Sequence, residues 1–261
     1  SSAPPIVSSI APEAAVLRKP PPPGPRFIES FTWMFESPQW FLNLLLVTLL
    51  VNLLPILGQI AAMGYFFVAI GEHLESPRFG YHDLDLARFV DYLKRGLRPW
   101  VVQIVATFLG IPIALLCYLP LFVAAIGLLN TGDEMSSLLG GFLMGVAYII
   151  YIGLLTVVSL APIPLIFRVG LTGDFRDALK IRWAFQYFRL LAPEIFWVTP
   201  LFILAMFPLM FLGLLACLVG IWFVVGWGYF SAFRLLLQLY ELFLARGGEP
   251  IPLPTPSKVA A

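Results

Sequence analysis

Apolar runs of about thirty residues recur along this chain, and almost every charged side chain falls between them. Hydrophobic residues make up 60% of the 261 residues, and charged residues only 12%. A soluble domain carries about a quarter charged residues, so this chain has too few of them to cover its surface against water. The surface therefore faces lipid, and the sequence predicts an all-α, polytopic transmembrane helical bundle.

The apolar runs are too long for single straight spans, because a span needs about 20 residues, or about 30 Å of helix. Pro55 and Gly58 interrupt the first run, which either kinks there or folds back as two short helices. The last run is long enough for two crossings, with a turn expected between Pro208 and Gly220. The four runs cover residues 40–71, 100–129, 138–167 and 195–244.

Basic residues distinguish the loops between these runs. Segments 72–99 and 168–194 hold five Lys or Arg each, whereas the turn at 130–134 holds none. Because Lys and Arg favour the cytoplasmic side, both long loops and both chain ends are predicted to be cytoplasmic, at the inner (cytoplasmic) membrane of a cell. About six spans satisfy this arrangement, and five spans with the N-terminus outside are the alternative.

The two basic loops resemble each other at a shift of 94 residues, which superposes Asp83 on Asp177 and Pro99 on Pro193. Either a parallel duplication or a shared composition explains the match. Both loops are expected to carry interfacial amphipathic helices, at 84–97 and 175–191, and a third is expected at 27–36. The side chains predicted to lie at the lipid headgroups are Trp33, Trp40, Arg88, Arg95, Trp100, Arg182, Trp183 and Arg189.

Both ends of the chain are rich in proline. The segments 1–26 and 246–261 are therefore predicted to be tails that flank a transmembrane domain at 27–245. Such segments have too few apolar residues to offset the entropy of ordering, so disordered ends are expected, with docking peptides as the alternative.

Three polar residues lie on one face of the last apolar run: Arg234, Gln238 and Glu241 follow one another at helical spacing. A charge at membrane depth is costly and usually functional. The favoured interpretation is a solvated extension of the helix beyond the membrane. In the alternative, these residues pair inside the bundle or line a pathway.

Two further patterns are less specific. Gly141 and Gly145 form a GxxxG motif, which lets two helices approach closely, either within the bundle or in a dimer. His73 and His82 lie near carboxylates, but the spacing matches no ligand pattern, so no metal site is predicted. No nucleotide loop, activated nucleophile or paired carboxylate is recognisable, so neither an enzyme nor a cofactor is predicted, although bound lipids are expected.

A family resemblance rests on Pro55-Ile56-Leu57-Gly58, on Gly64-Tyr65, and on Leu97-Arg98-Pro99-Trp100 after a charged loop. Over residues 40–245 the chain resembles an uncharacterised family of prokaryotic multi-pass membrane proteins, a domain of unknown function. The resemblance implies an integral membrane protein of bacterial or archaeal type and supplies no catalytic residues.

Three functions follow from these features as expectations. The first is a non-catalytic subunit that scaffolds or assists assembly of a larger membrane protein complex, with membrane lipids and other integral subunits as partners. The second is a transporter or channel for a small or hydrophobic solute. The third is a protein that shapes membranes with wedge-like hairpins. The net charge of +1 argues against nucleic-acid binding.

Overall fold

The computed structural model describes residues 24–75, 81–216 and 219–253, and every regular element within them is helical. Most of the predicted N-terminal tail and the last eight residues lie outside this part. Three short 3-10 helices are η1 (Trp33–Glu36), η2 (Leu86–Arg88) and η3 (Phe175–Leu179). The α-helices are α1 (Phe27–Thr32), α2 (Trp40–Leu53), α3 (Leu57–Glu75), α4 (Phe89–Leu129), α5 (Glu134–Leu160), α6 (Ile163–Thr172), α7 (Ile181–Leu215) and α8 (Val219–Ala245).

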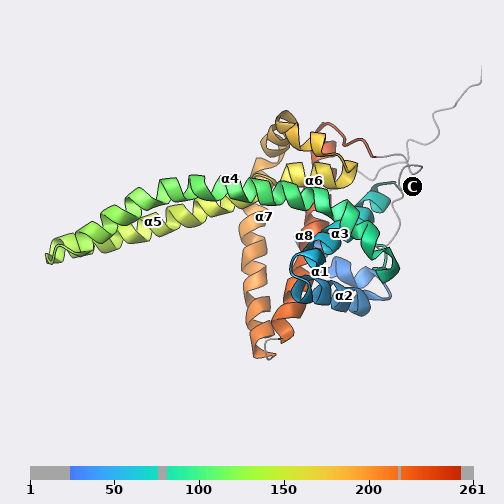
Figure 1. Ribbon diagram of the computed structural model, residues 1–261, viewed down its shortest axis with the longest axis horizontal. Helices are drawn as coiled ribbons and strands as arrows, with labels where there is room; N and C mark the ends of the chain where they lie inside the picture. The colour runs from blue at the N-terminus through green and yellow to red at the C-terminus, as the bar shows by residue number, and fades with distance from the viewer. Residues whose placement is uncertain (1–23, 76–80, 217–218, 254–261) are drawn as a thin grey trace, which may run out of the picture.

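Two hairpins of apolar helices leave a common body (Figure 1). The α4–α5 hairpin, called the arm below, runs far out to one side, while α7 and α8 run in a different direction. A turn with Gly132 in the left-handed conformation, at a φ of 76°, joins α4 to α5. Asp133 then caps α5 by accepting a hydrogen bond from the Ser136 backbone amide at 2.9 Å. The turn predicted at 130–134 is thereby confirmed.

The core of the body lies between α3 and α8. Phe66 on α3 stacks on Phe233 of α8, with ring centroids 4.4 Å apart. On its other side α3 meets the beginning of α4 at two glycines, Gly64 and Gly96. A Cβ at Gly96 would lie 1.8 Å from the Ile60 carbonyl oxygen, so only glycine permits this close approach. The contact fixes where α4 leaves the body.

The long helices are more continuous than the sequence suggests. The helices expected at 84–97 and 175–191 are not separate interfacial elements, because each segment is a 3-10 turn followed directly by the first turns of α4 or α7. Pro99 and Pro193 lie inside these helices and do not end them. Helices in membranes tolerate proline where neighbouring groups satisfy the freed carbonyls.

The two basic loops share one local feature, an Asp-capped 3-10 turn at the start of a long helix. Asp85 accepts a hydrogen bond from the Ala87 amide at the start of η2, and Asp174 does the same for Arg176 at η3. A long helix with three internal prolines follows each turn. The two capping aspartates lie 89 residues apart and not 94, so they do not follow the register that superposes Asp83 on Asp177, and the duplication stays a prediction.

The helices that are long and apolar enough to cross a membrane number four in the described part of the chain. They are α4 with η2, α5 with α6, α7, and α8; a fifth arises only if α1, η1 and α2, bent by 102°, form one span. This is fewer than the six spans expected and at most matches the alternative of five. The first apolar run does break at Pro55, but α2 has only 14 residues, too few for a complete crossing.

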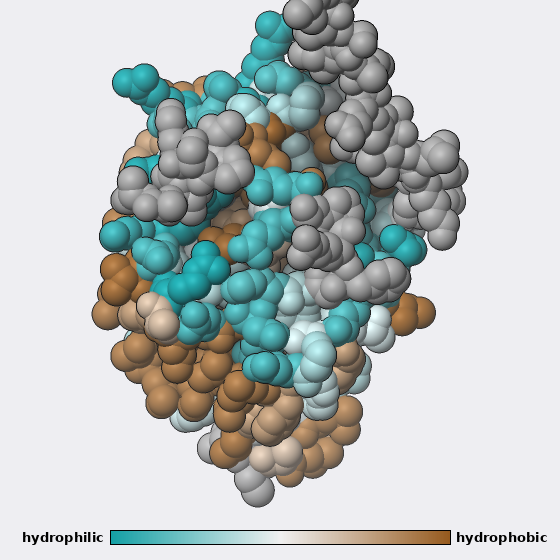
Figure 2. Space-filling view, turned by 90° about the vertical axis from the view of Figure 1, so that its right-hand side faces the viewer, coloured by the Kyte–Doolittle hydropathy of each residue, from teal (hydrophilic) through white to brown (hydrophobic). Residues whose placement is uncertain are grey.

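The polar surface gathers on one side of the molecule. Figure 2 shows the face turned away from the arm: hydrophilic residues cover its middle and upper part, and hydrophobic residues its lower part. Together with the four candidate spans, this segregation on the visible face is typical of a multi-pass membrane protein.

The beginning of the C-terminal tail is packed against the body, contrary to the expected disordered end. Trp183 donates a hydrogen bond from Nε1 to the Glu249 carbonyl at 2.9 Å. The Ile251 amide donates to the Tyr240 hydroxyl at 2.8 Å, and the Ile251 side chain is buried. Residues 249–253 therefore belong to the body, which the proline content alone did not indicate.

Candidate functional site

A buried polar cluster lies on the C-terminal half of α8, where this helix meets α1, η1 and α3. Three members share one face of α8, because Arg234, Gln238 and Glu241 are spaced by four and three residues. The others come from segments far away in the sequence. The six residues, called the Arg234 cluster below, are Glu29, Trp33, His73, Arg234, Gln238 and Glu241.

Arg234 is the centre of the cluster. Its side chain is 9% exposed, and its Nη2 donates to the Glu29 Oε1 atom at 2.7 Å. Glu29 also pairs through Oε2 with Arg26, at 2.7 Å. The guanidinium carbon of Arg234 lies 5.7 Å from the ring centroid of Trp33. One carboxylate and one aromatic face therefore stabilise a charge that would otherwise be prohibitive at this depth.

The pair of His73 and Glu241 forms the outer end of the cluster. The His73 Nε2 atom lies 3.9 Å from the Glu241 Oε1 atom, and Glu241 is the more exposed of the two. Burial, and to a lesser degree the positive charge of Arg234, lower the pKa of His73 below its usual value. His73 is thus held in its neutral form at neutral pH, and Glu241 faces the more open side.

Several buried polar atoms of the cluster have no hydrogen-bond partner among the described residues. They are Trp33 Nε1, His73 Nδ1, Arg234 Nε and Nη1, and Gln238 Nε2 and Oε1. A buried donor without a partner costs about 1–3 kcal/mol, and charged donors cost more. Such a concentration of unsatisfied groups is uncommon in a packed core and is typical of functional positions.

The solvated extension favoured for Arg234, Gln238 and Glu241 is wrong for the first two residues. Arg234 and Gln238 are buried, because α1, η1 and α3 cover this part of α8. The alternative of pairing inside the bundle is correct for Arg234, although its partner is Glu29 and not Glu241. One weak signal in the sequence points to Glu29, which lies on the polar side of the amphipathic segment 27–36.

Two of the tryptophans expected at the lipid headgroups lie in the core. Trp33 is 1% exposed and Trp183 is 3% exposed. The guanidinium carbon of Arg168 lies over the ring of Trp183, 5.0 Å from its centroid. Arg95 is also engaged, since it donates to the carbonyl oxygens of Gly170 and Leu171 at the end of α6. Interfacial roles for Trp33 and Trp183 are therefore wrong, whereas that of Arg95, which is half-buried, stays a prediction.

The other five residues of that prediction lie at or near the surface. Arg182 and Arg189 are exposed, while Trp40, Arg88 and Trp100 are half-buried. Each has side-chain surface outside the core, so contact with lipid headgroups stays a prediction for them.

The GxxxG motif does not pack against another part of this chain. Nothing lies within 4 Å of a Cβ built on Gly141 or Gly145. It is Gly140 that meets α4, where a Cβ would lie 2.9 Å from the Ala125 carbonyl oxygen. Packing of the motif within the bundle is thus wrong, and the dimer or partner contact stays a prediction.

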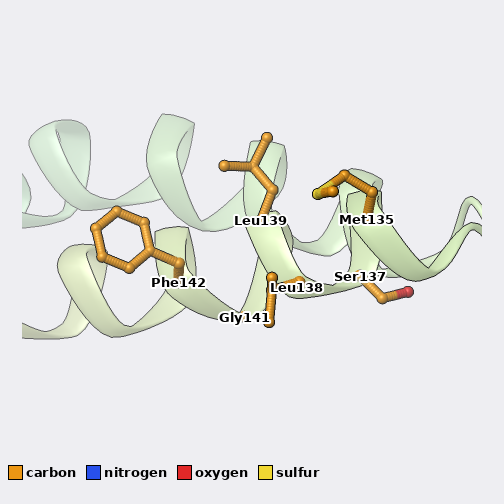
Figure 3. A pocket seen from close by; sticks show the side chains of 6 residues that line it. All are labelled: Met135, Ser137, Leu138, Leu139, Gly141 and Phe142. Atoms are coloured by element: carbon orange, nitrogen blue, oxygen red, sulfur yellow. The ribbon is translucent and has the colours of Figure 1, made fainter.

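An apolar face near the tip of the arm includes Gly141 (Figure 3). All six residues that form it belong to α5, so it is a shallow surface and not an enclosed pocket. They are Met135, Ser137, Leu138, Leu139, Gly141 and Phe142. The described residues include no group of three or more His, Cys, Asp or Glu side chains arranged to hold a metal ion.

The fold and this distribution of polar groups define a helical multi-pass membrane protein. A family model described as a protein of unknown function, DUF4013, matches residues 47–219, about two thirds of the chain. The chain belongs to this family, which confirms the resemblance inferred from the sequence. Neither a curated protein nor a solved structure matches it. The matched range includes the arm and His73, whereas the other five residues of the Arg234 cluster lie outside it.

We predict that the substitution Glu29→Gln destabilises the protein strongly. It leaves Arg234 buried without a counter-charge, which costs up to about 3–5 kcal/mol. Thermal unfolding in a mild detergent measures the effect. The matched control is Glu134→Gln, at an exposed carboxylate on the arm. The double variant Glu29→Gln, Arg234→Gln is expected to recover most of the loss, and equal stability of the Glu29→Gln and parent proteins would contradict the ion pair.

His73 is expected to make the stability depend on pH. Its pKa is lower in the folded than in the unfolded protein, where it is about 6.5, so the unfolded state binds more protons just below that pH. The free energy of unfolding should therefore fall as the pH drops through about 6.5 and toward the lower folded value. In pH-dependent melting curves, His73→Asn should remove this part of the fall, and an unchanged profile would contradict it.

Proposed function

We propose that the protein is a non-catalytic integral membrane subunit that assists assembly of a larger membrane protein complex, through its arm. The observation that carries this proposal is that the arm stands clear of the body (Figure 1). Many of its large apolar side chains are exposed. Phe108 on α4 is 74% exposed and Phe142 on α5 is 70% exposed.

An arm of this kind is suited to bind another membrane protein. In hydrocarbon, helices associate through close packing and small residues, since lipid is as apolar as leucine. Gly141 and Gly145 leave open space on the outward face of α5, next to Leu138 and Phe142. A partner helix can approach the backbone there. Within the body, α2 and α8 already pack closely in this way at Gly226, where a Cβ would lie 2.4 Å from the Thr48 hydroxyl oxygen.

For the topology, we infer four spans, with both long basic loops and both ends on the cytoplasmic side of the inner membrane. An even number of crossings keeps the basic segments together, as the positive-inside rule requires. In place of the hairpin that a six-span topology needs at 40–71, α2 and α3 enter the membrane only partway from the cytoplasm. The burial of α3 against α4 and α8 supports this, because such a helix contacts protein more than lipid.

A transporter or channel is the second candidate, and the Arg234 cluster is the observation that favours it. Ionisable groups buried at membrane depth often mark the path of an ion or solute. Here Arg234 and Glu241 belong to a candidate span, and several of their neighbours have unsatisfied polar atoms. Loss of solute uptake in a Glu241→Gln variant whose complex stays intact would favour this second function.

The assembly role predicts that Gly141→Leu separates the protein from its partners without unfolding it. The new side chain meets no described residue, so stability should be kept, while a partner helix would be displaced. Quantitative mass spectrometry of the complex, purified in a gentle detergent, measures partner stoichiometry.

The matched control is Gly153→Leu, on another face of the same helix and equally open. We expect stoichiometric partners with the parent protein and with this control. The assembly role would be wrong if the parent protein travels alone, or if both leucine variants retain every partner.

The topology predicts which positions an impermeant thiol reagent reaches from outside the cell. In a cysteine-free background, Thr131→Cys at the arm tip should react from outside, and Asp174→Cys only after permeabilisation. Ile56→Cys, which is 59% exposed, should behave like Asp174→Cys, because α2 and α3 do not cross completely. Labelling of Ile56→Cys from outside would instead establish the six-span topology.

A further inference from the structure

A cavity of about 210 Å³ lies where the two hairpins meet. Four helices contribute to it: Leu160 from the end of α5, Ile163 from α6, Val198 and Phe202 from α7, and Leu235 from α8. Figure 1 shows this region as the angle between the arm and α7. The cavity is separate from the Arg234 cluster and from the arm tip, so neither proposed function uses it.

The apolar lining of the cavity makes water an unfavourable occupant. Its lining is almost entirely aliphatic and aromatic, and it is far larger than the space of one water molecule, about 30 Å³ in the liquid. Apolar cavities of about 150 Å³ stay dry and take up apolar molecules. An empty cavity forfeits the dispersion contacts of its walls, so a hydrocarbon occupant stabilises the protein.

The position of the cavity identifies the source of the hydrocarbon. All four contributing helices belong to candidate membrane spans, and the lining runs from Tyr187 and Phe188 in the basic segment 168–194 into the apolar run at 195–244. The cavity therefore lies at the cytoplasmic end of the lipid-chain region. Phe188 is one of these lining residues, and the next residue, Arg189, is exposed and belongs to the same basic segment. A guanidinium there can reach a lipid phosphate while the chain enters the cavity. We propose that the cavity binds one acyl chain of an anionic membrane phospholipid.

The test uses the purified, full-length protein in phosphatidylcholine vesicles that contain a trace of phosphatidylglycerol with a photoactivatable acyl chain. We expect cross-links to concentrate on the cavity-lining parts of α7 and α8. Ala232→Phe, which fills the cavity, should lower this labelling by about tenfold, equivalent to about 1.4 kcal/mol of binding. Ala124→Phe, on an exposed position of α4, is the matched control and should leave labelling unchanged.

Further variants separate the contribution of the anionic headgroup from that of the acyl chain and guard against misfolding. Arg189→Gln should remove the preference for labelled phosphatidylglycerol over labelled phosphatidylcholine and leave chain labelling in place. If Ala232→Phe fails to fold, Ala232→Leu takes its place and should lower labelling by a smaller factor. Labelling that ignores all substitutions at Ala232 would overturn the proposal. So would labelling by a prenyl-chain probe in the absence of labelling by the acyl-chain probe.

Discussion

Hydrocarbon offers a polar group no hydrogen-bond partner, and this constraint orders the whole molecule. Every regular element of the described chain is helical, so the backbone satisfies itself. Polar side chains gather on one side (Figure 2), and the apolar hairpins extend away from it. Where a charge does enter an apolar helix, at Arg234, the chain supplies Glu29 and Trp33 from distant segments to stabilise it.

The two hairpins meet the same constraint in different ways. Of the four candidate spans, α8 is by far the most buried, because the N-terminal helices α1, α2 and α3 pack against it. The arm has no such cover, and α5 packs along α4 alone over most of its length. This difference underlies both proposals about partners. The uncovered arm is proposed to bind another membrane protein, and the cavity at its base is proposed to bind a lipid acyl chain.

The sequence predicted the elements that local patterns determine. The length of the apolar runs indicated spans, and the breaks at Pro55, at 130–134 and before Gly220 correspond to observed helix ends. Gly132 and Asp133 explain the second of these by turn and capping chemistry. Continuity through Pro99 was not predictable in this way, because a proline ends a helix only where neighbouring groups cannot satisfy the freed carbonyl.

The candidate site was predictable only in part. The spacing of Arg234, Gln238 and Glu241 identified one face of one helix, but the covering helices were not visible in that pattern. Glu29 lies 205 residues from Arg234, so no local rule joins them. Trp33 and Trp183 show the same limit, since an aromatic residue between polar neighbours suits a headgroup region and a core equally well.

The proposals for the arm and for the cavity both require that the arm and the α7–α8 hairpin diverge within the membrane. Spin labels at Met135, on the arm tip, and Leu215, at the end of α7, test it by pulsed electron resonance in lipid nanodiscs. Both positions are exposed. We expect a separation between the two labels much larger than that of neighbouring helices, which pack about 8–10 Å apart. A separation of only one or two helix diameters, about 10–24 Å, would instead show that the two hairpins close into one bundle.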